Sequence, residues 1–195
     1  MKQVRILSLL VLTMLAYGCF SSSRPTRIFV LSAAELQAVK SPIKVRVDRI
    51  MLPNYLKRWE LITIVNEREV RINDFAQWGE LLEDGVKRTM TENFRQLLGP
   101  EQVFNATSTD ALDCWRLDYD FLALFGNESG SFMVKAICKA RNANTTKRFP
   151  IAFELPDIAV KSEEKLIKAH EKGLARLALE TLARLQEIVE PKVNK

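Results

Sequence analysis

The stretch CWRLDYDFLALF-GNESG-SFMVKAICKA, residues 114–140, decides the fold. Apolar and polar residues alternate through both long runs, which is typical of strands that bury one face. The glycine-bracketed pentapeptide between the runs, residues 126–130, suits the turn of a hairpin. A third strand, residues 147–153, is expected to pair beside this hairpin.

Shorter strands are predicted on the amino-terminal side of the hairpin. Residues 43–50 alternate with period two, which puts the apolar positions from Ile43 to Val47 on one face. Residues 61–65 and 69–72 are read as two strands joined by a turn. Two further short strands are expected at residues 27–31 and, at a sheet edge, 102–104.

The first of two predicted helices covers residues 75–98. Asn73 or Asp74 is a plausible N-cap, and Gly99-Pro100 ends the pattern. Steps of three and four separate its apolar residues and predict one buried stripe, formed by Phe75, Trp78, Leu81, Leu82, Val86, Met90, Phe94, Leu97 and Leu98.

The second predicted helix lies between Ser162, its N-cap, and Pro191. Its acidic first turn suits the positive end of the helix dipole. The order strands, helix, strands, helix indicates an α+β fold. We expect a two-layer sandwich in which two long helices cover one face of a mostly antiparallel or mixed sheet.

The amino terminus has the pattern of a secretion signal. A basic start precedes an apolar run, residues 6–15, that is too short to span a bilayer. Small residues then lead to Cys19, which suits cleavage after Gly18 and acylation of the Cys19 thiol. An ordinary signal peptide with a coincidental cysteine is the alternative. The expected division is a signal peptide at 1–18, a lipidated flexible tether at 19–26 and one domain at 27–195.

The residue after the cysteine and the charge pattern bear on location and partners. Phe20 stands where Asp would retain an enteric lipoprotein in the inner membrane, so the outer membrane, on its periplasmic face, is expected. The chain has 29 Lys+Arg and 24 Asp+Glu, scattered rather than in blocks, which predicts no nucleic-acid partner.

The other two cysteines, Cys114 and Cys138, leave two interpretations open. An oxidising periplasm permits a disulfide between neighbouring strands, if the register brings the thiols together. Alternatively, both are buried thiols that pack as small apolar groups.

The residues capable of chemistry do not form a catalytic constellation. His170, the only histidine, borders the apolar stripe of the last helix, where a packed imidazole with one hydrogen bond is expected rather than a metal ligand. Asp118 and Asp120 share one strand face, which is typical of a solvated sheet surface. We therefore expect no enzyme, no metal site and no cofactor beyond the covalent lipid on Cys19.

The segment LPNYLKRW, residues 52–59, is the most unusual loop. Exposed large apolar side chains rimmed by charge often mark contact surfaces. The alternative is that Tyr55, Leu56 and Trp59 fold back onto the core.

Several motifs, in this order, resemble the ABC-type transport auxiliary lipoprotein family. They are LPNYLKR at 52–58, followed by LIT at 61–63, then QWGELL at 77–82, ENF at 92–94 and the Ala-His pair at 169–170. The resemblance covers nearly all of the chain after the signal peptide.

The resemblance implies a non-enzymatic component of a lipid-trafficking system of the cell envelope. Its partners would be an MCE-domain protein and the inner-membrane ABC transporter components, and the lipoprotein would act as a homo-oligomeric docking collar on the outer membrane. Contacts with a partner or a second copy are assigned to Tyr55, Leu56, Arg58 and Trp59, with the hairpin tip at 126–130 as second choice. Trp78 is expected in the core and Glu80 near the first helical turn.

Two other functions remain open at this stage. The chain could be an envelope scaffold or activator lipoprotein for cell-wall or lipopolysaccharide assembly machinery. It could also be a lipid carrier, which would require an apolar cavity in the body.

Overall fold

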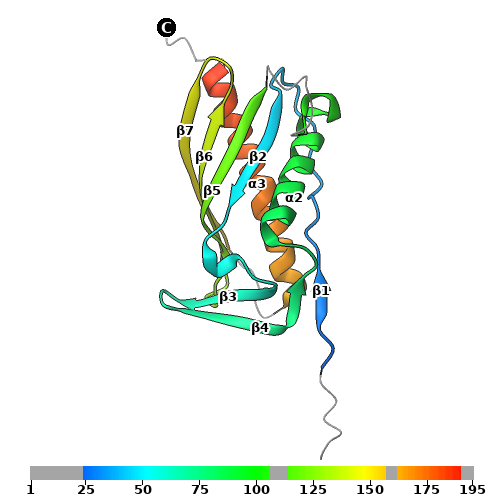
Figure 1. Ribbon diagram of the computed structural model, residues 1–195, viewed down its shortest axis with the longest axis vertical. Helices are drawn as coiled ribbons and strands as arrows, with labels where there is room; N and C mark the ends of the chain where they lie inside the picture. Colours follow the sequence, from blue (N-terminus) through cyan, green and yellow to red (C-terminus); the bar gives the residue numbers. More distant parts are fainter. Residues whose placement is uncertain (1–23, 106–113, 157–161, 190–195) are drawn as a thin grey trace, which may run out of the picture.

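The computed structural model describes residues 24–105, 114–156 and 162–189, which form two sheets and two long helices (Figure 1). The expected α+β class is therefore confirmed. The predicted signal peptide, Cys19 and residues 20–23 of the predicted tether lie outside the described residues.

The larger sheet contains the hairpin on which the fold prediction depended. Its strands have the order β2-β5-β6-β7, with β2 parallel to β5 and the other pairs antiparallel. The bounds are β2 Val45–Met51, β5 Trp115–Gly126, β6 Phe132–Arg141 and β7 Thr146–Leu155. Buried and exposed positions alternate along β5 and β6, as the sequence predicts.

A second, smaller sheet lies across one end of the molecule (Figure 1). It has the order β1-β4-β3, where β1 is parallel and β3 antiparallel to β4. Its strands are β1 Arg27–Phe29, β3 Glu60–Asn66 and β4 Glu69–Trp78. The sequence predicted one sheet, and this division into two is the main difference in topology.

The predicted helix at 75–98 is wrong in its first seven residues, because α2 runs only from Leu82 to Leu98. Residues 69–78 form β4 instead. The side chain of Asn73 accepts a hydrogen bond from the Phe75 N–H at 3.1 Å in a local turn, so it does not cap a helix. The Trp78 N–H donates to the Trp59 carbonyl at 2.7 Å, which makes it part of a strand pair.

The predicted edge strand at residues 102–104 is also wrong. Residues 102–104 do not form a strand; a short 3-10 helix, η2 Pro100–Gln102, is followed by a single bridge between Val103 and Val45. Val103 is buried, and its single bridge to Val45 places it beside the edge strand β2 of the larger sheet.

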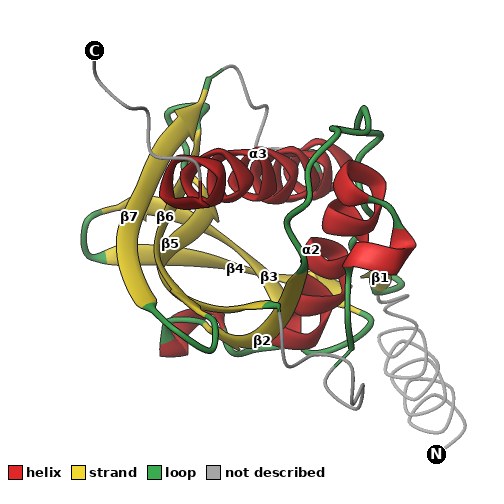
Figure 2. Cartoon of the chain, turned by 90° about the horizontal axis from the view of Figure 1, so that it is seen from above, coloured by secondary structure: helices red, strands yellow, loops and turns green. Residues whose placement is uncertain are grey.

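The two long helices form the second layer, on one face of the larger sheet (Figure 2). The last helix, α3, runs from Glu163 to Val189, close to the predicted bounds. Between helices and sheet lies the core, which includes the fully buried Val86, Met90, Phe94, Leu117, Tyr119, Leu174 and Leu177. No helix in the described part of the chain combines the length and the apolar character needed to cross a membrane.

Residues 30–44 connect the two sheets as an extended segment without helix or strand over most of its length. This segment is held against α2 by hydrogen bonds. Arg88 donates to the Leu31 carbonyl at 2.8 Å, and the Val39 N–H donates to the Leu97 carbonyl at 2.7 Å. The contacts fix β1, and with it the amino-terminal end of the described chain, to the body.

Candidate functional site

The loop at 52–59 joins the two sheets and contains a single 3-10 turn, η1 Asn54–Leu56. Pro53 is the N-cap of the turn and has an extended backbone, with φ −55° and ψ 145°. The Leu56 N–H then donates to the Pro53 carbonyl at 2.9 Å, and the Lys57 N–H donates to Asn54 at 3.1 Å. The loop therefore has a defined backbone.

The side chains of this loop divide between core and surface. Leu56 is 3% exposed and packs in the core, so its assignment as an interface residue is corrected here. A 3-10 helix turns by about 120° per residue, so inward-facing Leu56 leaves its neighbour Tyr55 facing solvent. Tyr55 and Trp59 are 37% and 49% exposed. Leu56 therefore folds back onto the core, whereas Tyr55 and Trp59 remain at the surface, where the predicted contact stays a prediction.

Ion pairs hold the loop in place. Arg58 Nε lies 2.9 Å from a carboxylate oxygen of Glu60, and this hydrogen bond lowers the pKa of the Glu60 carboxyl. Lys57 Nζ lies 3.1 Å from Glu83, whose carboxylate also accepts from the Leu52 N–H at 3.1 Å. The exposed rings of this loop are therefore presented on an ordered backbone, which reduces the entropy lost when a partner binds.

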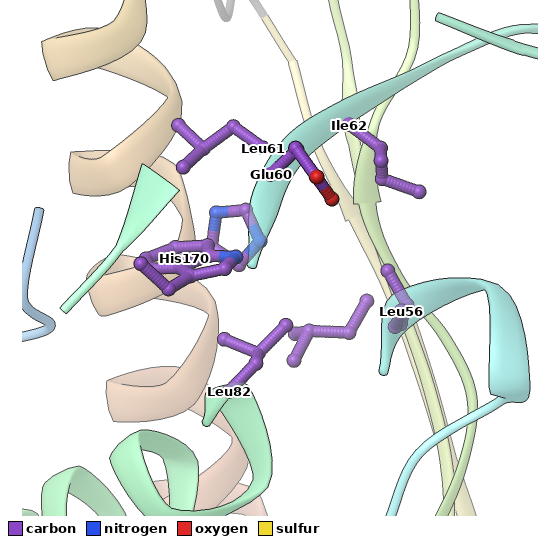
Figure 3. Close-up of a pocket in the computed structure, with 8 residues that line it drawn as sticks. Leu56, Glu60, Leu61, Ile62, Leu82 and His170 are labelled. Carbon is purple, nitrogen blue, oxygen red and sulfur yellow. The ribbon is translucent and has the colours of Figure 1, made fainter. Parts of the chain in front are cut away.

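Behind the loop lies a small cavity (Figure 3). It is lined by Leu56, Glu60, Leu61, Ile62, Trp78, Leu82, Leu124 and His170, and its volume is about 10 Å³. That is roughly the space of one water molecule. A second hollow, beside Pro42 and Gln186, measures about 100 Å³. Ligand pockets typically measure roughly 300–1,000 Å³, so neither space has room for a lipid.

His170 lines this cavity from α3 and is 3% exposed. Its Nδ1–H donates to the Leu166 carbonyl at 2.9 Å, and its ring lies between the rings of Trp78 and Phe132. Burial lowers the pKa of His170 to about 4, so the imidazole is neutral at neutral pH. It is packed with one hydrogen bond, as the sequence analysis expected, and Trp78 is in the core.

The carboxylates considered for catalysis lie on the solvent face of the larger sheet. Asp118 is paired with Arg141 at 2.9 Å, and Asp120 is two residues further along the same strand. Within the described ranges, no group of three or more His, Cys, Asp or Glu side chains could hold a metal ion. The part of the chain that the structure describes therefore offers no metal centre.

The two cysteines are buried and far apart along the hairpin. Cys138 lies opposite Tyr119 in the register of β5 and β6, five residues along the chain from Cys114. At about 3.4 Å per residue this separates them by roughly 17 Å, whereas a disulfide needs Cα atoms within about 7 Å. This register is incompatible with the disulfide and favours the buried-thiol interpretation.

The hairpin tip at 126–130, the second-choice interface, is docked on the smaller sheet. The Glu128 N–H donates to the Ile64 carbonyl at 3.0 Å, and the Glu128 carboxylate forms an ion pair with Arg71. The polar groups of Glu128 at the tip are therefore already bonded within the chain. The 52–59 loop is the stronger candidate for contact with a partner.

The structure also exposes apolar side chains that the sequence analysis missed. Ile28 lies in β1 and Val30 follows it, Phe75 lies on β4, and Leu81 precedes α2; all four are more than 40% exposed. Phe75 and Leu81 were assigned to the buried stripe of the first helix. The only warning in the sequence is Gly79, which interrupts that helix pattern between them.

Comparison with known proteins identifies the chain. A family model described as an ABC-type transport auxiliary lipoprotein component matches residues 29–181. The chain belongs to this family. The match includes the 52–59 loop, both helices up to residue 181 and all strands except the first two residues of β1, and it agrees with the resemblance found in the sequence. The family is not a class of enzymes. No curated protein matches the sequence.

Solved structures support the fold of this auxiliary lipoprotein. The crystal structure of an uncharacterized protein has a TM-score of 0.68 at 14% identity, covering 83% of this chain and 99% of that one. Protein XCC0632 from Xanthomonas campestris, assigned to the family DUF330, has a TM-score of 0.60 at 12% identity, covering 84% and 95%. At these identities the similarity concerns the fold alone.

Proposed function

We propose that this chain is a periplasmic lipoprotein, anchored in the outer membrane, that serves as a non-enzymatic docking component of an MCE-type ABC lipid transport system. The single observation that carries the proposal is the family match over residues 29–181. The MCE partner and the outer-membrane location come from the sequence resemblance and from the residues around Cys19.

The chemistry of the body supports action by contact rather than by catalysis or lipid carriage. Its histidine is buried and uncharged at neutral pH. The cavity beside that histidine, about 10 Å³ in volume, is far too small for an acyl chain. A lipid carrier needs an apolar interior space, which favours a docking role over carriage.

We place the protein contact at the 52–59 loop. Tyr55 and Trp59 are half-exposed aromatic side chains on an ordered backbone, and Arg58 lies beside them. Tyrosine, tryptophan and arginine are the residue types that most often dominate binding energy in interfaces. The loop would contact the MCE-domain protein or a second copy within a homo-oligomer.

The anchor is tested by mass spectrometry of the mature protein and by membrane fractionation. The expected result is a chain beginning at an acylated Cys19 in the outer-membrane fraction, and a Cys19→Ser variant that is not acylated. An unmodified mature chain in the soluble fraction would contradict the anchor.

The partner is tested by affinity purification from detergent-solubilised membranes. MCE-domain and ABC transporter subunits should co-purify with the unaltered protein and with Leu179→Ala, a control at an exposed apolar residue of α3. Trp59→Ala should reduce recovery about 30-fold, since a hot-spot residue contributes roughly 2 kcal/mol. Recovery of cell-wall or lipopolysaccharide assembly proteins instead would favour the scaffold or activator function.

A further inference from the structure

The exposed large apolar side chains of the described residues gather at one end of the molecule. Eight belong to the smaller sheet or to the segments that enter and leave it, and a ninth ends β2 just before the 52–59 loop; in chain order they are Ile28, Val30, Met51, Tyr55, Trp59, Val70, Ile72, Phe75 and Leu81. The other four are scattered: Val39, Leu122, Leu179 and Val189. The described chain also begins at this end, just before β1 (Figure 1).

Within this end, the most exposed of these residues lie in β1 and directly after it. Ile28 is 70% exposed and Val30 is 53% exposed. Their γ-carbons lie 3.1 and 3.0 Å from the position that a Cβ on Gly79 would occupy, so both side chains pack over the bare backbone of Gly79. Glycine at this position lets β1 lie close to the chain that leaves β4.

Phe75 lies on the same side of the smaller sheet as Ile28, and Leu81 lies just after that sheet in the chain. Along β4, Ala76 and Trp78 are buried whereas Phe75 is 41% exposed, so Phe75 faces outward on the same side as Gln77. Gln77 is the register partner of Ile28. Leu81, 49% exposed, follows Gly79 by two residues. We name Ile28, Val30, Phe75 and Leu81 the β1 patch.

Exposed apolar side chains gathered on one part of a chain often mark a contact surface, so we expect the β1 patch to be covered in the cell. We propose that the β1 patch rests on the surface of the lipid bilayer, as a second membrane contact beside the acyl anchor. The inference rests on the proposed lipidation of Cys19.

The length of the tether points to the bilayer as the surface that covers the patch. Nine residue steps separate Cys19 from Ile28, so even a fully extended chain holds the patch within about 30 Å of the acylated residue. The hydrogen bonds of the 30–44 segment to α2 fix β1 to the body, so the end that carries the patch is the end held near the membrane.

Two arginines bring positive charge to the patch, which also has the exposed carboxylate of Asp74 beside it. Arg24 lies 6.0 Å from the centre of the Phe75 ring and brings a positive charge to the edge of the patch. The nearby carboxylates of Glu163 and Glu164 are paired with Arg27, which offsets their repulsion from anionic head groups. Apolar contact combined with a nearby cation is how peripheral proteins bind such surfaces.

The test uses residues 19–195 with Cys19→Ser, so that no acyl chain contributes to binding. This chain retains the whole core, which extends from Leu31 to Leu185. It is floated with vesicles of phosphatidylethanolamine and phosphatidylglycerol at three to one. We expect a measurable bound fraction, and an apparent affinity at least about tenfold lower for Ile28→Ser combined with Val30→Ser. Leu122→Ser, at a 57% exposed residue of β5, is the matched control and should bind as the parent does.

Light scattering without vesicles gives the solution mass of each variant. This mass shows whether the β1 patch contacts a second copy of the chain instead of the bilayer. We expect the parent and the double variant to have the same mass. A parent that associates and a double variant that does not would make the patch a subunit interface and overturn the proposal. A parent that does not float, or a double variant that floats equally well, would overturn it as well.

Two further measurements keep the result unambiguous. Thermal unfolding shows whether the double variant is folded, and Leu81→Ser tests the patch outside β1 and should also weaken flotation. An unacylated Cys19 in the natural protein would contradict the proposed anchor but would leave this assay unaffected. Failure of the anchor and failure of the membrane contact are therefore distinguishable.

Discussion

The imidazole of His170 on α3 meets the indole of Trp78 on β4 edge-on, with the ring centroids 5.2 Å apart and the planes at 78°. This contact joins the smaller sheet to the helix layer. His170 is the only histidine of the chain, so its protonation can be followed without interference from other imidazoles.

The first prediction concerns the pH dependence of stability. The pKa of His170 is about 4 in the folded state and 6.5 when solvated, so the unfolded chain binds more protons between these values. The free energy of unfolding should therefore fall as the pH drops from 6.5 towards 4, by about 3 kcal/mol at roughly 1.4 kcal/mol per pKa unit. Urea unfolding at a series of pH values measures this.

A His170→Leu variant is the control for that prediction. It removes the titrating group but keeps an apolar side chain between the rings of Trp78 and Phe132. Its stability should vary much less over the same range. An equally steep dependence in both proteins would show that carboxylates, and not the imidazole, are responsible.

A second prediction concerns the buried pair Tyr119 and Thr181. The Tyr119 hydroxyl donates to Thr181 Oγ1 at 3.0 Å, and both residues are fully buried between the larger sheet and α3. Tyr119→Phe leaves the threonine oxygen without this donor and should cost about 1–3 kcal/mol. In the Tyr119→Phe protein, a further Thr181→Val substitution should lower the free energy of unfolding by less than Thr181→Val does in the unaltered protein, because its hydrogen-bond partner is already absent. Additive losses in chemical unfolding would disprove the coupling.

Two helical glycines should respond in opposite ways to substitution by alanine. A Cβ on Gly173 would lie 3.0 Å from Val134 and 3.1 Å from Phe132, both packed in the core, so Gly173→Ala should cost about 1–3 kcal/mol. The nearest atoms to a Cβ on Gly85 all belong to the flexible Glu80 side chain, at 3.3 Å or more, so Gly85→Ala should gain up to about 1 kcal/mol of helix stability. Thermal unfolding of both variants tests the contrast.

A fourth prediction concerns thiol reactivity. Burial raises the pKa of the Cys138 thiol to about 12, so almost no thiolate is present at pH 8. In the Cys19→Ser protein, iodoacetamide should leave Cys138 unmodified until the chain is unfolded in urea. Rapid modification of the native protein, or a mass gain on reduction before alkylation, would contradict the buried, unbridged thiol.

The long periodic segments were predictable from the sequence because local pattern and tertiary environment agree there. The hairpin of β5 and β6 and the helix α3 lie within a few residues of their predicted bounds. Both have one buried face and one solvated face, which is the situation that alternation and three/four spacing describe.

The three strands of the smaller sheet were predicted, but the second half of β4 and the separation into a sheet of its own were not. The spacing from Phe75 to Trp78 matches a helix, yet Phe75 is exposed and Trp78 is buried against α3, so the two never shared a face. A pairing between β4 and β1, some fifty residues earlier, decides their conformation. Long-range contacts of this kind leave no trace in a local window.

The candidate site was half predictable. The composition of the 52–59 loop singled out a contact surface, but whether Leu56 or its neighbour Tyr55 faces solvent depends on one 3-10 turn. The β1 patch was missed because a short strand at a sheet edge has too few residues to show an alternation.

The extended segment at 30–44 and the strand before it have a mechanical consequence. A pull at the amino-terminal end along β1 would load the backbone hydrogen bonds to β4 and the bonds to α2 in shear, so that several must break together and not one after another. A force transmitted between an anchored end and a bound partner would then be borne by the folded body as a unit, without peeling the first strand away.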